Sequence, residues 1–270
     1  MTAYEDELPP LNLPRRRPRV IPVLLLKGGL LHKPKQFSAP KYVGDPRVAV
    51  KIFNDKGADE LALLDMTATT ERREPDFALI EEIVSESLMP IAYGGGIRTY
   101  EQAARILELG VEKVILNSAL VEVPDLSERI ANVFGAQSVI GCLDCRKSFL
   151  GGYKSYVGAG QRSTGMKPED LARKVAARGV GEIIVQAIDR EGVGNGYDLA
   201  LIKRVADAVD VPVIALGGAR TPADFKQATD AGAAAAAAGS MFVFNGPHRA
   251  VLITYPTDEQ LHAAFGTRDA

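Results

Sequence analysis

Two stretches decide the fold of this chain: Ile91-Ala-Tyr-Gly-Gly-Gly-Ile-Arg-Thr99 and Val213-Ile-Ala-Leu-Gly-Gly-Ala-Arg-Thr221. They lie 122 residues apart (213 − 91 = 122), and several other positions repeat at the same distance. The repeated pairs are Gly57-x-x-Glu60 with Gly179-x-x-Glu182, Asp76-x-x-Leu-Ile with Asp198-x-x-Leu-Ile, Pro90 with Pro212, and Gly110 with Gly232. One distance that holds over this many positions indicates an internal duplication. We therefore expect two related halves of one structure.

Short apolar runs alternate with helical patterns from Arg19 onward, which is typical of βα units on a parallel sheet. Eight such runs predict strands that begin near Val20, Leu61, Pro90, Val114, Ser138, Ile183, Val211 and Ala234. Eight is the number of strands in a TIM barrel. The sequence therefore predicts an α/β protein with a single (β/α)₈ barrel at residues 19–265, made of two half-barrels. Flexible tails are expected at residues 1–18 and 266–270.

Helix start signals fit this plan. Asp76 precedes one apolar helical pattern, Thr99 and Gln102 have the spacing of a capping box, and Thr221 is followed by proline and, three residues on, by Asp224. Such residues satisfy the free N–H groups of a first helical turn. We expect helices to begin at these three places.

Composition and charge exclude several classes of protein. A formal net charge of −2 argues against nucleic-acid binding. No apolar stretch approaches the roughly 20 residues needed to span a bilayer, and nothing at the N-terminus marks the chain for secretion. We expect a cytoplasmic protein that binds neither nucleic acid nor membrane. The basic cluster Arg15-Arg16-Arg17 is predicted to be solvated.

Glycine-rich turns follow strands at symmetric positions of the two halves. Gly94-Gly95-Gly96 and Gly217-Gly218 are accompanied by Asn117-Ser118 and Gly239-Ser240. In a barrel these positions lie at the carboxyl ends of the strands, here called the mouth, where ligands bind. Glycine lets backbone N–H groups approach an anion, and a following helix N-terminus adds a favourable dipole. One pair could be only a tight turn, but two symmetric pairs favour two phosphate cradles and a ligand phosphorylated at both ends.

One carboxylate closes the strand near Ser138. Asp144 is predicted to point into the mouth between the two cradles, where it could act as a general acid or base. Alignment of residues 20–27 with residues 139–146 gives Leu25 as its counterpart in the first half, and leucine cannot transfer a proton. Three other carboxylates are expected near the mouth: Asp65, Asp189 and Glu191. Of these, Asp65 is the second catalytic candidate.

The residue just before a strand is charged four times. These residues are Arg19, Glu60, Lys113 and Glu182. Since parallel strands begin at the same end of a barrel, here called the bottom, two positive and two negative side chains meet at one level. The spacing predicts a closed ring of ion pairs.

The cysteines and histidines predict no redox or metal site. Cys142 and Cys145 form a C-x-x-C string, but they lie in a predicted strand, where positions three apart point to opposite faces. His32, His248 and His262 are scattered without ligand spacing. We expect neither a metal nor a cofactor.

From Arg19 to about Phe244 the sequence resembles the cyclase subunits of imidazole glycerol phosphate synthase. The strings that carry the resemblance are Asp59-Glu-Leu-Ala-Leu-Leu-Asp-Met-Thr-Ala68, Tyr93-Gly-Gly-Gly-Ile-Arg98, Glu112-Lys-Val-Ile-Leu-Asn-Ser118, Gly181-Glu-Ile-Ile184, Ile188-Asp-Arg190 and Gly196-Tyr-Asp198. The resemblance implies a glutaminase docked on the barrel bottom, from which ammonia passes through the barrel. It implies an ammonia gate at Arg19, Glu60, Lys113 and Glu182. It also implies phosphate binding at Gly95, Gly96, Asn117, Ser118, Gly192, Gly217, Gly218, Gly239, Ser240 and Lys33.

Departures from the family pattern cluster at the mouth. The family's pair of catalytic aspartates falls on Asp144 and Leu25, so the acid/base pair is broken. Gln186 and Leu216 stand where a small hydroxyl residue is expected. With the unusual loop at residues 28–37 and the tail at residues 242–256, these changes resemble a paralogous branch associated with acetamidino modification of surface-polysaccharide sugars. That resemblance implies a further partner that activates the sugar.

Three functions follow as hypotheses. The first is an amidotransferase synthase subunit that delivers ammonia to a phosphorylated acceptor, such as a polysaccharide sugar. The second is the cyclase–lyase of histidine biosynthesis, with Asp65 or water replacing the missing acid. The third is a non-catalytic subunit that conducts ammonia to an enzyme docked on its mouth, where Leu25, Leu216 and Leu30-Leu31 would provide an apolar contact.

Overall fold

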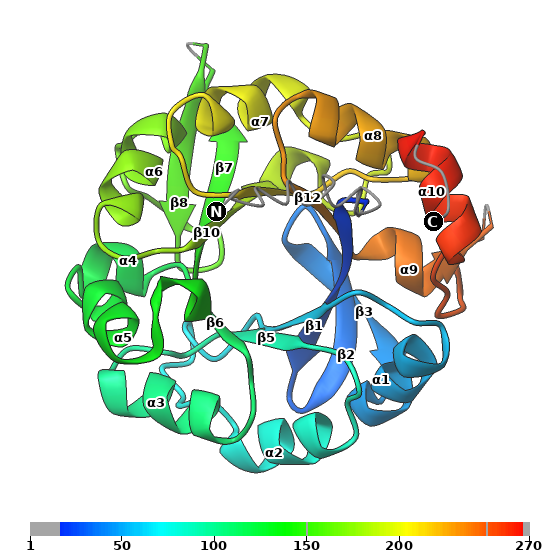
Figure 1. The fold of residues 1–270 in the computed structure, drawn as a ribbon, viewed down its shortest axis with the longest axis horizontal. Coiled ribbons are helices and arrows are strands. Elements are labelled where there is room, and N and C mark those ends of the chain that lie inside the picture. The colour runs from blue at the N-terminus through cyan, green and yellow to red at the C-terminus, as the bar shows by residue number, and fades with distance from the viewer. Residues whose placement is uncertain (1–16, 150, 247, 267–270) are drawn as a thin grey trace, which may run out of the picture.

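The computed structural model describes residues 17–149, 151–246 and 248–266. Eight parallel strands form a closed barrel (Figure 1). They are β1 (Arg19–Lys27), β4 (Leu61–Asp65), β5 (Ile91–Gly94), β6 (Lys113–Leu116), β7 (Val139–Lys147), β10 (Glu182–Ala187), β11 (Val213–Leu216) and β12 (Ala235–Ala238). The pairings of β7 with β10 and of β12 with β1 complete the circle. The predicted TIM barrel is confirmed, and each barrel strand begins within two residues of its predicted start.

Helices surround the barrel on its outside (Figure 1). They are α1 (Pro46–Asp55), α2 (Phe77–Ser85), α3 (Tyr100–Glu108), α4 (Ala119–Glu122), α5 (Leu126–Phe134), α6 (Pro168–Ala176), α7 (Leu199–Ala206), α8 (Pro222–Asp230), α9 (Ser240–Val243) and α10 (Asp258–Phe265), with short 3₁₀ turns η1 (Ala136–Ser138) and η2 (Ile188–Arg190). The three predicted helix starts are confirmed. Asp76 accepts a hydrogen bond from Leu79 N at 3.1 Å, and Thr99 forms a capping box with Gln102. The Asp224 carboxylate accepts from Thr221 N at 2.8 Å.

The two halves share local conformations as well as residues. Asp198 caps α7 through Leu201 N at 3.2 Å, as its counterpart Asp76 caps α2. Gly110 and its counterpart Gly232 both have left-handed φ angles, at 100° and 105°. Side chains other than glycine rarely adopt this conformation, so the repeated glycines mark the same turn in each half.

Three further strand pairs lie outside the predicted pattern. An antiparallel hairpin of β2 (Leu30–Lys35) and β3 (Ser38–Gly44) extends from the end of β1. Strands β8 (Tyr153–Val157) and β9 (Arg162–Ser163) extend from β7, and β13 (Phe244–Asn245) pairs with β14 (Ala250–Val251). The turn from β1 into β2 has a sequence signal, because Gly28-Gly29 separates two apolar runs and both glycines have positive φ.

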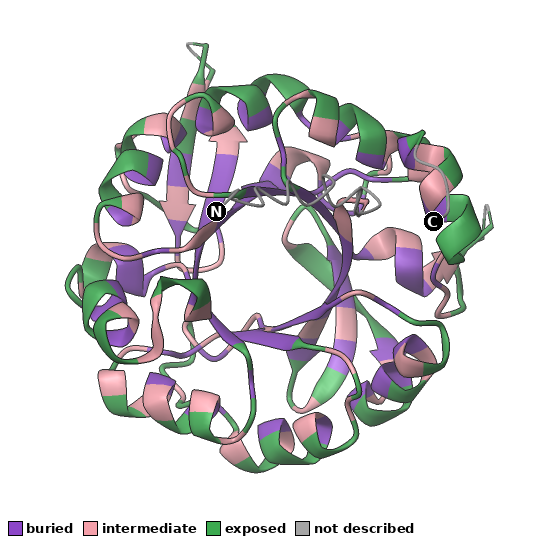
Figure 2. Ribbon diagram, viewed as in Figure 1, coloured by how far each residue is buried: buried purple, intermediate pink, exposed green. Residues whose placement is uncertain are grey.

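Apolar side chains form two cores. The larger lies between the barrel and its helices, and the smaller fills the barrel interior. Figure 2 shows buried strands within an outer layer whose helices expose one face. Cys142 belongs to the inner core and Cys145 to the outer one, as strand geometry predicts, and both thiols are free. Four alanines, Ala62, Ala92, Ala235 and Ala237, make part of the inner wall small.

The end of the N-terminal segment differs from expectation. The Arg17 side chain is only 10% exposed, because its guanidinium contacts Asp59 at 2.6 Å and Asp258 at 2.5 Å. Two carboxylates brought together by the fold therefore hold this arginine, which was predicted to be solvated. The flexible tails predicted at the two ends concern mainly residues 1–16 and 267–270, which lie outside the described residues. Among the helices of the described part, none has both the length and the apolar character needed to cross a bilayer.

Candidate functional site

Four charged side chains close a ring at the barrel bottom. Arg19 Nη1 donates to Glu60 Oε2 at 2.5 Å, and Arg19 Nη2 donates to Glu182 Oε1. Lys113 Nζ lies 3.3 Å from both oxygens of Glu60 and 3.1 Å from Glu182 Oε2. Each acid therefore contacts both bases, and the ring that the spacing predicted is present.

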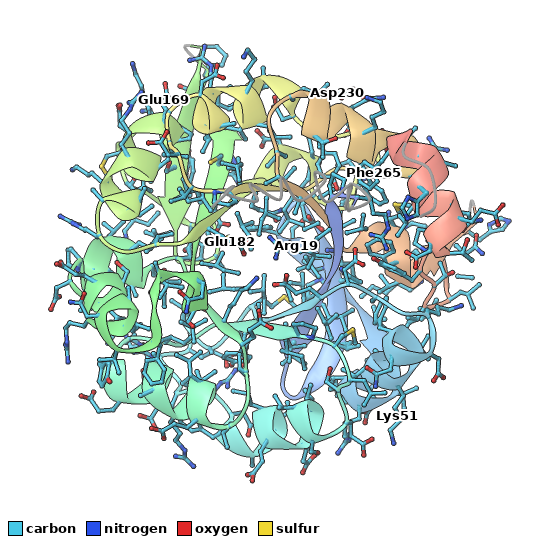
Figure 3. The ribbon with its side chains drawn as sticks, in the orientation of Figure 1. Arg19, Lys51, Glu169, Glu182, Asp230 and Phe265 are labelled. Carbon is cyan, nitrogen blue, oxygen red and sulfur yellow. The ribbon has the colours of Figure 1, made fainter. Side chains whose placement is uncertain are left out.

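The ring follows directly from the parallel barrel. Arg19, Lys113 and Glu182 are the first residues of their strands, and Glu60 immediately precedes β4. Figure 3 shows Arg19 and Glu182 near the centre of the barrel, whereas Lys51 and Asp230 lie on the outer rim. Burial raises the pKa of the Glu60 carboxyl, and the charges of Lys113 and Arg19 oppose that shift. The ring thus places strongly interacting charges across one end of the barrel interior.

A cavity of about 320 Å³ lies at the mouth, the opposite end of the same interior. Its apolar lining includes Val23, Leu25, Leu64, Ile115 and Leu216, and the β2–β3 hairpin adds Pro34, Phe37 and Pro40. Its charged lining comes from Lys27, Lys33, Asp65, Arg98, Glu122, Asp144 and Glu191. A mostly apolar cavity with a few converging polar groups is typical of a site for a small molecule.

Asp144 is the carboxylate best placed for proton transfer. It lines the cavity and is 7% exposed. Burial raises its pKa to about 7, with a smaller contribution from the negative charge of Glu191, while a weak hydrogen bond from Cys142 Sγ at 3.8 Å opposes the shift. A carboxyl with this pKa is present in both protonation states near neutral pH, which suits a general acid or base.

Leu25 also lines the cavity, from β1. It lies in register with Leu64 of β4, and Asp144 lies in register with Gln186 of β10. No carboxylate therefore stands at the position that matches Asp144 in the first half. The expectation from the sequence, that one member of an acid/base pair is missing, agrees with this arrangement.

Asp65 has a different environment from Asp144. Its Oδ1 accepts hydrogen bonds from Thr67 N and Ala68 N, both at 3.0 Å, and its Oδ2 lies 3.3 Å from Arg73 Nη2. These contacts hold the loop between β4 and α2 against the end of the strand. The predicted catalytic role of Asp65 gains no support from this geometry, because its carboxylate already accepts from the backbone and an arginine.

The cradle of the first half opens into the cavity. Gly95, Gly96, Asn117 and Ser118 all line it. Asn117 Nδ2 donates to Cys142 O at 2.9 Å, and Gly158 N donates to Ser118 Oγ at 2.9 Å. A Cβ on Gly95 would fall 2.4 Å from Asp65 O, so the glycine is required by the neighbouring loop whether or not an anion binds.

The cradle of the second half does not open into the same cavity. Within the described part of the chain, the lining of this cavity does not include Gly192, Gly217, Gly218, Gly239 or Ser240. A Cβ on Gly217 would fall 2.7 Å from Ala187 O, which matches the close approach at Gly95 in the first half. Phosphate binding by the second cradle stays a prediction.

Two basic residues of the cavity were not singled out from the sequence. Arg98 lines it directly after the first-cradle glycines, and Lys27 lines it at the end of β1. Arg98 Nη2 donates to Arg73 O at 2.9 Å, and the buried Arg98 Nε has no hydrogen-bond partner among the described residues. Arg98 recurs as Arg220 in the second half, and this recurrence could have marked it as a candidate site residue. The repeat did not show that, of the two arginines, only Arg98 lines this cavity.

Comparisons with known proteins agree with this architecture. A family model described as "Histidine biosynthesis protein" matches residues 19–247. A Pseudomonas aeruginosa protein, provisionally named imidazole glycerol phosphate synthase subunit hisF2, is 50% identical over 246 residues, which are 91% of this chain and 98% of the relative. A provisionally named HisF subunit of Leptospira interrogans is 44% identical over 92% of this chain and 99% of the relative. The HisF subunit of Alkaliphilus metalliredigens is 40% identical over 84% of this chain and 90% of the relative.

The chain belongs to the imidazole glycerol phosphate synthase cyclase-subunit family. The match at residues 19–247 includes all four ring residues, both cradles and Asp144, and it ends before β14 and α10. The provisional names of the more similar relatives fit a paralogous branch of this cyclase family. Leu25 is the feature of the cavity that departs most clearly from a cyclase with two catalytic carboxylates.

Proposed function

We propose that this chain is the ammonia-accepting, cyclase-type synthase subunit of a glutamine amidotransferase. One observation carries the proposal: a closed ring of ion pairs and a cavity with a titratable carboxylate occupy opposite ends of one barrel interior. The names of the relatives, which are subunits of imidazole glycerol phosphate synthase, add support.

The partner in this proposal is a glutaminase that docks on the barrel bottom. Ammonia released there would enter between Arg19, Glu60, Lys113 and Glu182. Charged partners that already satisfy one another leave a small neutral molecule no strong binding site, so ammonia would pass on rather than remain at the ring. Beyond the ring, alanines of β4, β5 and β12 contribute small side chains to the inner core.

At the mouth, Asp144 is the proposed proton donor and acceptor. A nucleophilic ammonia must lose a proton as its nitrogen bonds to the acceptor, and a carboxyl with a pKa of about 7 can take that proton near neutral pH. Gly95, Gly96, Asn117 and Ser118 are proposed to hold a phosphate of the acceptor, with Arg98 supplying positive charge next to the glycines. Asp65 is proposed to position the loop that borders this cradle.

Two acceptors compete. The names of the relatives favour the nucleotide substrate of histidine biosynthesis. Leu25 and the sequence resemblance to the acetamidino branch favour a surface-polysaccharide sugar activated by a third protein. The non-catalytic alternative loses its basis in part, because Leu31 and Leu216 are buried and cannot form a contact surface.

The deciding experiment is ammonia-dependent turnover of the histidine-pathway nucleotide by the purified chain, with a known cyclase subunit as the control. Turnover within about 100-fold of the control would assign the histidine acceptor, since loss of one general acid or base typically costs 10² to 10⁴ fold. Absence of turnover from a folded protein would exclude that acceptor. If Asp144→Asn then left product formation unchanged in the assembly with its glutaminase, the synthase proposal itself would fail.

A further inference from the structure

The second cradle is covered by the chain itself. Strand β2 lies across it: a Cβ on Gly192 would fall 2.9 Å from Pro34 O, 3.2 Å from Lys35 Cα and 3.5 Å from Ser240 Oγ. A Cβ on Gly239 would fall 2.1 Å from Lys33 Nζ. At Gly192 and Gly239, the side on which a side chain would lie therefore holds the backbone of β2 and a lysine ammonium group, whereas Gly217 faces the end of β10 and Gly218 faces the loop after it.

That ammonium group already has a counter-ion. Lys33 forms a salt bridge with Glu191, and both residues are only 4% exposed. Gln186 Nε2 donates to Glu191 Oε2 at 2.9 Å, which fixes the carboxylate. A phosphate in this cradle would have to share Lys33 with a buried carboxylate at contact distance, and two anions so close repel each other strongly where water is excluded.

The covering hairpin is fastened from several directions. Gln36 N donates to Glu191 O at 2.9 Å, and Gln36 Nε2 donates to Asp189 O at 2.8 Å. Lys41 Nζ of β3 donates to Arg249 O at 3.3 Å, and Arg249 Nη1 donates to Gly192 O at 2.9 Å. At the tip, a Cβ on Gly160 would fall 2.9 Å from Phe37 Cδ2, so the hairpin reaches the loop between β8 and β9. To admit an anion, the structure would have to break these contacts together.

The first cradle has the opposite character. It opens into the cavity, and Arg98, which follows its glycines in the chain, lines the cavity too. The Nε of Arg98 is buried and unpartnered among the described residues, so it retains a hydrogen bond to donate. Within that part of the chain, Ser240 Oγ in the second cradle is unpartnered as well, but the ammonium group beside that cradle, Lys33, is already paired with Glu191. The two cradles therefore differ in the cation next to them, because the arginine at the first retains a donor and the lysine at the second is neutralised.

We propose that the acceptor is anionic at one end only, with its phosphate in the first cradle and a neutral, hydroxyl-bearing end beneath the Lys33–Glu191 pair. This inference rests on the proposed function, because it concerns the acceptor of that site. At the neutral end, Glu191, Gln186 and Asp144 offer carboxylate and amide groups suited to hydroxyls. A sugar or polyol that carries phosphate on one side has this chemistry, whereas a ligand phosphorylated at both ends does not.

The duplication supplies a matched pair of variants for the test. Ser118 and Ser240 occupy equivalent positions of the two halves (240 − 118 = 122), one in each cradle. Binding of inorganic phosphate to the intact chain would be measured by calorimetry, together with the number of phosphates bound per chain. We expect one phosphate per chain, about 10-fold weaker binding in Ser118→Ala through loss of a charge-assisted hydrogen bond, and unchanged binding in Ser240→Ala.

The other outcomes separate the two proposals. Two phosphates per chain, one of them weakened by Ser240→Ala, would overturn the single-anion inference and leave the proposed function intact. One phosphate that responds to Ser240→Ala and not to Ser118→Ala would also overturn it. If no phosphate binds, the phosphate site in the proposed function fails, and this inference fails with it.

Discussion

Replacement of Asp144 by asparagine is expected to stabilise this protein at neutral and alkaline pH, although it removes the proposed proton carrier. The folded-state pKa of Asp144 is raised to about 7 from an ordinary value of 3.8, chiefly because the carboxyl is buried. A raised carboxyl pKa means that the folded state binds its proton more tightly than the unfolded state does. The wild type therefore loses stability as pH rises from about 4 to about 7, and the loss is complete above pH 7.

The magnitude follows from the two pKa values. A difference of about 3 units at 1.36 kcal/mol per unit corresponds to a penalty on the order of 4 kcal/mol above pH 7. Asparagine has nearly the same shape and no charge, so it avoids the penalty. Between pH 5 and pH 8 the stability advantage of Asp144→Asn over the wild type should grow by about 3 kcal/mol, with most of the growth below pH 7.

The assay is urea-induced unfolding at a series of pH values, with m-values compared so that a change in the unfolded state is not mistaken for a change in stability. The exposed Asp210→Asn is the matched control, and its difference from the wild type should not follow the same curve. An Asp144→Asn variant whose stability advantage is the same at pH 5 and pH 8 would refute the raised pKa. It would also remove the reason to assign proton transfer to this residue.

Three further predictions concern the ring, the second-half turn and the missing carboxylate. Glu60→Gln should destabilise the fold by about 3 kcal/mol, because it leaves two bases at the bottom with Glu182 as their only ring acid, whereas the exposed Glu81→Gln should have little effect in the same urea assay. In the assembly with its glutaminase, Glu60→Gln should also lower product formation from glutamine more than product formation from added ammonia. Equal losses with the two nitrogen sources would argue against an ammonia gate. Gly218→Ala should cost about 3 kcal/mol or more, since its Cβ would fall 2.2 Å from Gly196 O at a φ of 109°, whereas Gly28→Ala, with no atom within 4 Å, should cost only about 1 kcal/mol in thermal unfolding. Leu25→Asp restores a second carboxylate but should not yield turnover of the histidine-pathway nucleotide, because the second cradle stays covered; measurable ammonia-dependent turnover by a folded variant would contradict this.

The sequence by itself determined the barrel, its duplication and the two ends of its interior. Alternating apolar and helical patterns repeat at a constant distance and predict a parallel barrel. In such a barrel all strands begin at one end and finish at the other, so the order of residues along each strand assigns them to the bottom or the mouth. For that reason Arg19, Glu60, Lys113 and Glu182 could be expected to meet, and Asp144 could be expected at the mouth without a carboxylate opposite it.

Only the tertiary structure decided what each polar group at the mouth contacts. Asp65 and Asp144 are both buried near the carboxyl ends of barrel strands, yet Asp65 accepts hydrogen bonds from a loop whereas Asp144 lies beside Cys142. The covering of the second cradle by Lys33 depends on a hairpin whose path over the mouth no local pattern specifies. Burial, counter-ions and the resulting pKa depend on residues far away in the chain, so they follow from packing rather than from periodicity.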